Sequence, residues 1–163
     1  MRYFVLTISF ILFLAACDSN KVMTIDAPKS QAEQDFKALI DSHAGKTIYV
    51  DFWASWCVPC RKSFPWLNSL SSKYDTNKFV VLSVNLDNQK KLAEKFLSQT
   101  PADFKIFYDP DSRVARQYKV EGMPASYLIS PNGDIIWRHR GFNENNANSY
   151  ESEIEKALSS EYP

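Results

Sequence analysis

The sequence predicts an α/β fold in which a mixed central sheet is flanked by helices. Segments rich in β-branched and aromatic residues alternate with segments whose apolar residues recur at helical spacing, which is typical of strands joined by helical crossovers. Further along, the turn sequence 131–134 (Pro-Asn-Gly-Asp) separates two strand-like segments and predicts a hairpin. Crossovers join parallel strands and a hairpin joins antiparallel ones, so the sheet is expected to be mixed.

The predicted elements follow this alternation along the chain. A capping box at Ser30 and Glu33 begins the first helix, and Gly45 ends it. Pro65 falls inside the second helix, where a proline removes a backbone hydrogen bond and is expected to cause a kink. The predicted segments are helix 30–45, strand 47–54, helix 61–74, strand 79–86, helix 88–98, strand 104–108, helix 112–118, strands 125–130 and 135–140, and a last helix that includes 150–158.

The segment 56–60, Trp-Cys-Val-Pro-Cys, is the clearest indication of a chemical function in the sequence. It joins a predicted buried strand to a predicted helix, so Cys57 is expected at the helix N-terminus. Unpaired N–H groups and the helix dipole favour a thiolate there. Because the thiolate is the form that attacks a disulfide, this spacing indicates dithiol–disulfide exchange between Cys57 and Cys60.

The two cysteines could also have other roles. A structural zinc site needs four ligands, but no third cysteine lies near this pair in the sequence. The only histidines are His43 and His139, which are predicted as surface residues, so no metal site is expected. Covalent haem attachment needs a histidine directly after the second cysteine, where Arg61 stands. A purely structural disulfide, or two inert core thiols, stays an alternative.

The first 16 residues have the form of a signal peptide. The apolar segment 3–14 is shorter than the roughly 20 residues that a membrane-spanning helix needs. It runs into Leu-Ala-Ala-Cys at 14–17, which resembles the lipobox of bacterial lipoproteins, in which the cysteine is diacylated and becomes the new N-terminus. The alternative is an ordinary signal peptide cut near Ala16, with Cys17 left free.

The lipobox divides the chain into a signal peptide (1–16), a lipidated tether (17–29) and a folded domain (30–163). Asp18 resembles the residue that keeps lipoproteins of enteric-type bacteria in the inner membrane. We therefore expect an inner-membrane lipoprotein, anchored at Cys17, that faces the periplasm or the cell exterior. Acylation of Cys17 would leave an even pair of cysteines in an oxidising compartment.

The composition allows a packed domain and gives no electrostatic reason to expect nucleic-acid binding. Hydrophobic residues make up 45% of the chain, and 19 basic residues balance 19 acidic ones.

The segment from Val50 to Cys60 closely resembles the active-site segment of thioredoxins. The sequence 122–124 (Gly-Met-Pro) resembles their second landmark, a proline that follows a loop and opens a strand. Between Asp87 and Pro124 the chain has room for an extra helix and a short strand, which is similar to the TlpA/ResA family of membrane-anchored thiol–disulfide oxidoreductases. The resemblance covers about residues 30–158 and implies a thioredoxin-like fold with a helix–strand insert before a cis-proline loop.

The resemblance implies catalytic roles for three residues. Cys57 would be the exposed nucleophile, and Cys60 would resolve the mixed disulfide. Asp51 would lie under the motif and relay the proton of Cys60, because a carboxyl group in an apolar strand tends to have a raised pKa. The alternative for Asp51 is a hydrogen-bonded strand residue without a catalytic part.

The resemblance also implies substrate-binding roles for Trp56, Pro59, Met123 and Pro124. Trp56 would shield the cysteine pair, with core packing as the alternative. Met123 would flank the sulfurs and tune the reduction potential. Pro124 would be a cis proline beside the disulfide, its neighbour's backbone free to pair with substrate. An ordinary trans loop proline is the alternative.

Two positions depart from the family pattern. Thioredoxins carry a lysine on their third strand near the buried aspartate, and Ser83 takes that position, so Asp51 is expected to lack a cationic partner. Many TlpA/ResA members carry a glutamate two residues before the helix proline, and Ser63 stands there.

The function implied by the resemblance is that of a membrane-tethered protein-disulfide reductase whose only redox group is the Cys57–Cys60 pair, with no further cofactor. It would take electrons from a membrane thiol donor and reduce a protein disulfide, such as that of an apocytochrome or a metal-site cysteine pair. A monomer is expected. The alternatives are a thiol oxidant or disulfide isomerase with the same pair, and a non-enzymatic binding module, which the intact pair with Asp51 and Pro124 argues against.

Overall fold

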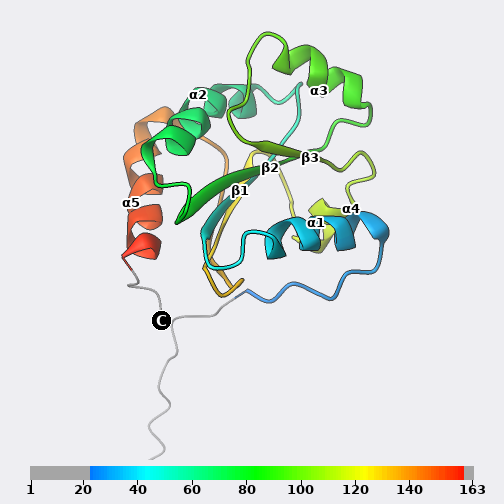
Figure 1. Ribbon diagram of the computed structural model, residues 1–163. Helices are drawn as coiled ribbons and strands as arrows, with labels where there is room; N and C mark the ends of the chain where they lie inside the picture. The colour runs from blue at the N-terminus through cyan, green and yellow to red at the C-terminus, as the bar shows by residue number, and fades with distance from the viewer. Residues whose placement is uncertain (1–22, 160–163) are drawn as a thin grey trace, which may run out of the picture.

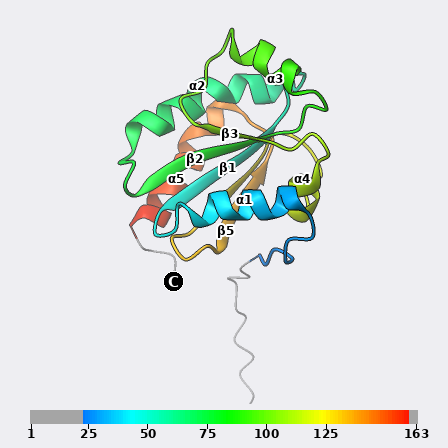
Figure 2. The same ribbon diagram turned by 45° about the vertical axis from the view of Figure 1, so that its right-hand side comes forward.

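The computed structural model describes residues 23–159 as a five-stranded sheet with helices on both faces (Figures 1 and 2). The predicted signal peptide and Cys17 lie outside the described residues. The helices are α1 (Gln31–Asp41), α2 (Val58–Lys73), α3 (Lys90–Leu97), α4 (Arg113–Gln117), the 3₁₀ helix η1 (Glu144–Asn146) and α5 (Ala147–Leu158); the strands are β1 (Thr47–Trp53), β2 (Phe79–Asn85), β3 (Lys105–Tyr108), β4 (Ala125–Ile129) and β5 (Ile135–Arg140).

The sheet has the strand order β3-β2-β1-β4-β5. Strands β1, β2 and β3 run parallel to one another, because α2 and α3 connect them as crossovers. Strand β4 pairs antiparallel with β1, and the hairpin to β5 adds the last antiparallel strand. The predicted mixed sheet and the insert of α3 and β3 are confirmed.

Strand β1 lies at the centre of the sheet and is buried along its whole length. Successive side chains of a strand point to opposite faces. Tyr49, Asp51 and Trp53 therefore share the face that α2 and α5 cover, and the residues between them pack toward α1 and α4. Both Figure 1 and Figure 2 show these two helix layers on opposite sides of the sheet.

Helix α1 has the predicted capping box, in which the Ser30 hydroxyl accepts from the Glu33 N–H and the Glu33 carboxylate accepts from the Ser30 N–H. Helix α2 begins at Val58, earlier than predicted. Pro59 sits in its first turn, where a missing N–H loses no helical hydrogen bond. The helix then continues through Pro65 as one element.

The segment before α1 lies against the domain from Met23 onward. Met23 forms an isolated bridge with Ile135 of β5, and Ile25 packs against the core. The Gln117 side-chain amide donates a 2.7 Å hydrogen bond to the Asp26 carbonyl. Residues 23–29, which the sequence predicts as part of a tether, thus contact the fold. No helix between residues 23 and 159 is long and apolar enough to cross a bilayer.

Candidate active site

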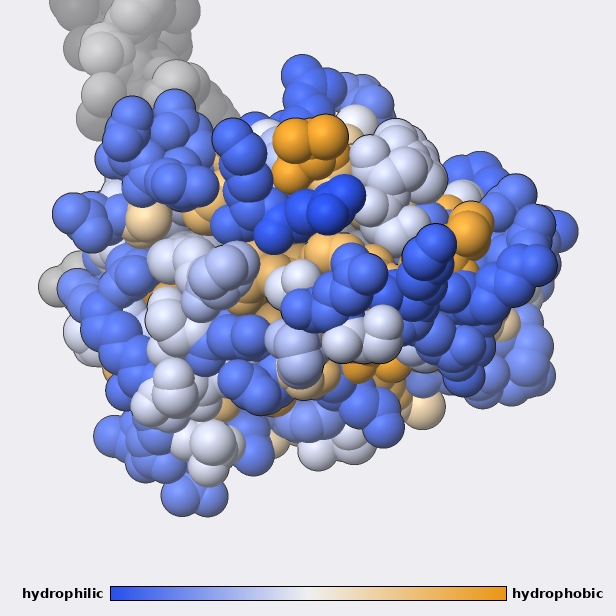
Figure 3. Space-filling view, turned by 90° about the horizontal axis from the view of Figure 1, so that it is seen from above, coloured by the Kyte–Doolittle hydropathy of each residue, from blue (hydrophilic) through white to orange (hydrophobic). Residues whose placement is uncertain are grey.

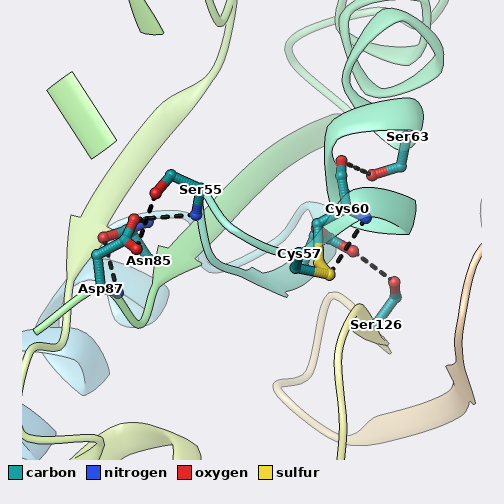
Figure 4. The surroundings of a disulfide bond; sticks show 8 residues. Ser55, Cys57, Cys60, Ser63, Asn85, Asp87 and Ser126 are labelled. Carbon is teal, nitrogen blue, oxygen red and sulfur yellow. Dashed lines mark hydrogen bonds between the residues drawn. A yellow bond between two sulfur atoms is a disulfide. The ribbon is translucent and has the colours of Figure 1, made fainter. Parts of the chain in front are cut away.

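Cys57 and Cys60 form a disulfide at the junction of β1 and α2 (Figure 4). Cys57 is the N-cap of α2, and its Sγ accepts a 3.3 Å hydrogen bond from the Cys60 N–H. Cys57 is 6% exposed, whereas Cys60 is fully buried. Cys57 is therefore the sulfur that a substrate can reach, and the positive end of the helix dipole favours its thiolate.

Asp87 holds the loop that leads into the motif. Its carboxylate accepts hydrogen bonds from the Ser55 N–H and hydroxyl, both 3.0 Å, and from the Asn85 side-chain amide at 2.8 Å (Figure 4). Asp87 is 2% exposed, so these bonds are shielded from water. Sequence reasoning used Asp87 only as a landmark and missed this role, because its partner Ser55 is far away in the sequence.

Asp51 is buried beneath the helix layer that contains Cys60. It is 2% exposed, and the Ser126 hydroxyl donates a 2.7 Å hydrogen bond to its Oδ1. Burial raises the pKa of Asp51 to about 7, although the bond from Ser126 acts in the opposite direction. A carboxyl group with this pKa can exchange a proton near neutral pH.

The register of the sheet places Ser83 and Ser126 on either side of Asp51. Ser83 of β2 and Ser126 of β4 are both register partners of Asp51. Ser83 is uncharged and accepts a 3.1 Å hydrogen bond from the Trp53 indole N–H. It therefore does not give Asp51 the cationic partner that the lysine provides in thioredoxins. Ser126 was missed, because its place beside Asp51 depends on the pairing of distant strands.

Ser63 bonds to the backbone of the resolving cysteine. Its hydroxyl donates a 2.8 Å hydrogen bond to the Cys60 carbonyl, and its side chain is buried (Figure 4). Ser63, which stands where many TlpA/ResA members have a glutamate, therefore stabilises the first turn of α2 through this hydrogen bond and adds no ionisable group.

The Met123–Pro124 peptide bond is cis, as the resemblance implies. Met123 packs against the cluster that contains Cys57 and Cys60. Pro124 is buried, and its carbonyl accepts a 2.7 Å hydrogen bond from the Gly141 N–H. The Gly-Met-Pro segment at 122–124 thus lies beside the cysteine pair.

Trp56 and Val58, on either side of Cys57, are 68% and 62% exposed. The alternative of core packing for Trp56 is therefore wrong. Pro59 is half-buried in the first turn of α2. The nucleophile is thus framed by two exposed apolar side chains.

His43 and His139, which the sequence predicts as surface residues, are both of intermediate exposure. The Nε2 of His139 lies 2.9 Å from the Tyr49 hydroxyl, and its ring stacks on Tyr150 at 4.2 Å. Burial lowers the pKa of His139 to about 4, so its imidazole is neutral at pH 7.

Across residues 23–159, no three or more His, Cys, Asp or Glu side chains are grouped so that they could hold a metal ion.

The chain is similar to curated thiol–disulfide oxidoreductases named ResA. The one from Oceanobacillus iheyensis is 29% identical over 126 residues, which cover 72% of this chain and 66% of that protein. The one from Bacillus subtilis is 28% identical over 92 residues, which cover 56% and 51%. The chain thus spans about half to two thirds of the length of these relatives.

Solved structures show that the fold is thioredoxin-like. A structure from Chlorobium tepidum, assigned as a thiol:disulfide interchange protein DsbE, is 44% identical with a TM-score of 0.71, covering 73% of this chain and 84% of that one. StoA from Bacillus subtilis, at 24% identity and a TM-score of 0.60, covers 68% and 84% and shares the fold. The sequence pattern of the Redoxin family matches residues 20–158. This chain therefore belongs to the Redoxin family.

Proposed function

We propose that this chain is a thiol–disulfide oxidoreductase that reduces disulfides in other proteins. The observation that carries the proposal is the placement of Cys57 at the N-cap of α2, where it is 6% exposed while Cys60 is fully buried. This arrangement gives one attacking and one resolving thiol, as exchange through a mixed disulfide requires.

The reaction begins with the reduced pair. The Cys57 thiolate attacks one sulfur of the substrate disulfide, forms a mixed disulfide, and releases the other substrate sulfur as a thiolate, which takes a proton from water. Cys60 then gives its proton to Asp51 and attacks the Cys57 sulfur. The second substrate thiolate leaves and takes up that proton, so the substrate gains two electrons and the Cys57–Cys60 pair becomes a disulfide.

Asp51 supports this sequence of steps because its carboxylate is a base that is buried away from water. With a pKa raised to about 7, its carboxylate holds a proton far more tightly than an ordinary aspartate does. It lies on the face of β1 that α2 covers, and the first turn of α2 contains Cys60.

The substrate would be a protein segment in an extended conformation. The backbone of Met123 takes part in no hydrogen bond with the rest of residues 23–159, so its N–H and C=O are available to a substrate strand. Trp56 and Val58 offer apolar contacts beside the attacking sulfur. We propose an apocytochrome or a metal-site cysteine pair as the client.

We further propose that the chain is anchored in the membrane by lipid at Cys17 and works on the periplasmic or outer side, where a membrane thiol protein reduces it again. The lipobox at 14–17 supports this. Expression of the wild type and of Cys17→Ser with radiolabelled palmitate tests it. Label and membrane association in the wild type, both lost in Cys17→Ser, are expected. A soluble, unlabelled wild type would contradict the anchor.

The reduction potential of the Cys57–Cys60 pair tests the direction of electron flow. A value near that of thioredoxin, about −270 mV, is expected for a reductase. A value near that of DsbA, about −120 mV, would contradict it and favour the oxidant. If no reversible two-electron couple is found, the chain is a binding module.

A further inference from the structure

The exposed large hydrophobic side chains of the described chain lie next to Cys57 in the sequence and on α3. Among residues 23–159 they are Trp56, Val58 and Leu92, at 68%, 62% and 37% exposure. Trp56 and Val58 adjoin Cys57, and Leu92 belongs to α3 of the insert. Figure 3, which views the molecule from the α3 side, shows isolated hydrophobic side chains among strongly hydrophilic ones. Such a set beside a reactive sulfur is suited to contact with another protein.

Two hollows lie between α2 and α3 next to this apolar set. The larger, with a volume of about 300 Å³, is lined by Val58, Arg61, Lys62, Phe96 and Thr100. The smaller, of about 180 Å³, is lined by Ser55, Arg61, Leu92, Lys95, Phe96 and Gln99. Because both are lined by Arg61 and Phe96, the two hollows adjoin each other, and we refer to them together as the recess. Their linings include Ser55 and Val58, which are close to Cys57 in the sequence.

The floor of this recess is apolar and firmly packed. The Phe96 ring lies 4.9 Å from the Phe64 ring and 5.5 Å from the Trp53 ring, in the cluster that contains both cysteines. The Arg61 guanidinium stands 5.5 Å above the Phe96 ring and is thereby directed over the recess.

The rim of the recess is positively charged. Arg61, Lys62 and Lys95 are exposed, and none of them forms an ion pair with any residue between 23 and 159. Neither set of lining residues contains an acidic side chain. Of the nearby carboxylates, Glu94 pairs with Lys90 at 3.4 Å, and Asp87 is buried and bonded to Ser55.

We propose that this recess binds an acidic segment of the substrate protein, next to the disulfide that Cys57 attacks. Three unpaired cations without a facing anion favour negative side chains and disfavour positive ones. The apolar floor and the side chains of Val58 and Leu92 contact the aliphatic parts of the same segment. This inference rests on the proposed reductase function and defines the charge of its substrate.

Disulfide-linked peptides test the proposal. Three peptides of equal length carry aspartate, serine or lysine on both sides of the cysteine, and the purified reduced protein is mixed with each in excess. The rate of peptide reduction is followed at low ionic strength. We expect the acidic peptide to react at least about tenfold faster than the basic one, and the difference to shrink at about 0.5 M salt.

Charge reversal locates the effect. The double variant Lys62→Glu/Lys95→Glu should reduce the basic peptide fastest. The control Lys46→Glu/Lys78→Glu makes the same change in net charge at the residues before β1 and β2, at the opposite end of the sheet. This control should keep the wild-type order of peptide reduction rates. The neutral reagent hydroxyethyl disulfide reports the chemistry of the cysteine pair alone. Its reduction at the wild-type rate by both variants shows that both are folded.

The outcomes separate the two proposals. Equal rates for the three peptides, or an acidic preference that survives in Lys62→Glu/Lys95→Glu, would overturn the acidic-segment proposal while normal reduction of hydroxyethyl disulfide leaves the reductase in place. Failure of the wild type to reduce any peptide or the neutral reagent would overturn the reductase itself.

Discussion

Ser126 donates a 2.7 Å hydrogen bond to one carboxylate oxygen of Asp51, and the other oxygen has no partner among residues 23–159. An ionised carboxylate can accept about four hydrogen bonds, so one donor does not replace the water that burial removes. The neutral form is favoured, and the pKa rises to about 7. The chain thus has a group that changes charge near neutral pH on the face of β1 that α2 covers.

The raised pKa of Asp51 predicts a loss of stability as the pH increases. Between the ordinary value of 3.8 and about 7, the native state holds a proton that the unfolded chain has released. The contribution of Asp51 to the free energy of unfolding should therefore fall through this window, by about 4 kcal/mol in total. His139, whose pKa is lowered to about 4, contributes a rise between pH 4 and 6.5 that Asp51→Asn shares. The difference between the wild type and Asp51→Asn therefore isolates the Asp51 contribution, and the variant should gain on the wild type by this amount between pH 4 and 8.

Urea unfolding of the oxidised protein from pH 4 to 8 measures this effect. Asp111→Asn, which changes an exposed aspartate, is the matched control and should follow the wild type. Parallel stability curves for the wild type and Asp51→Asn would mean that Asp51 has an ordinary pKa.

Ser126→Ala should move the pKa of Asp51 further upward. The hydroxyl is the one side chain that lowers this pKa, and its loss leaves the buried carboxylate without a donor. We expect the midpoint of the stability fall to shift to higher pH, with a loss of about 1–3 kcal/mol in alkaline solution. Carboxyl ¹³C NMR titration follows Asp51 directly.

Ser83→Ala is the control for this change. Ser83 is also buried and is also a register partner of Asp51, but its hydroxyl bonds to Trp53. Its loss should lower stability without moving the Asp51 titration. Equal shifts in both variants would show that the sheet as a whole, rather than the Ser126 hydroxyl, sets the pKa.

The strands and helices could be predicted from the sequence because their signals are local. The apolar run of β1, the capping box of α1 and the turn between β4 and β5 each lie within a few residues. The predicted start of α2 at Arg61 is too late, because Pro59 occupies the first turn of the helix, where a proline is tolerated.

The residues that were missed depend on long-range pairing. Ser126 meets Asp51 because β4 returns antiparallel to β1 in one particular register, and a shift of one residue would turn its side chain to the other face. Asp87 meets Ser55 across the ends of two strands, and His139 reaches Tyr49 across the sheet. No local pattern specifies these contacts.

Asp87→Ala should destabilise the loop that carries the active cysteine. It leaves the Ser55 N–H, the Ser55 hydroxyl and the Asn85 amide without their acceptor in a buried site, at a cost of about 3 kcal/mol. Ser55→Ala removes only the hydroxyl bond and should cost about 1 kcal/mol. Thermal unfolding of the oxidised proteins compares the two, and equal losses would show that the carboxylate is not the centre of this network.

Cys60→Ser should trap the substrate on the protein. Without the resolving thiol, the mixed disulfide that Cys57 forms persists, and it is seen as a slower band on a non-reducing gel that disappears with reductant. Cys57→Ser should form no such complex, because Cys60 is fully buried, whereas Cys57 is 6% exposed. Iodoacetamide should likewise modify Cys57 before Cys60 in the reduced wild type. A complex that forms through Cys60 instead would reverse the assignment of the two thiols, because Cys57, at the helix N-terminus, would then not be the residue that attacks.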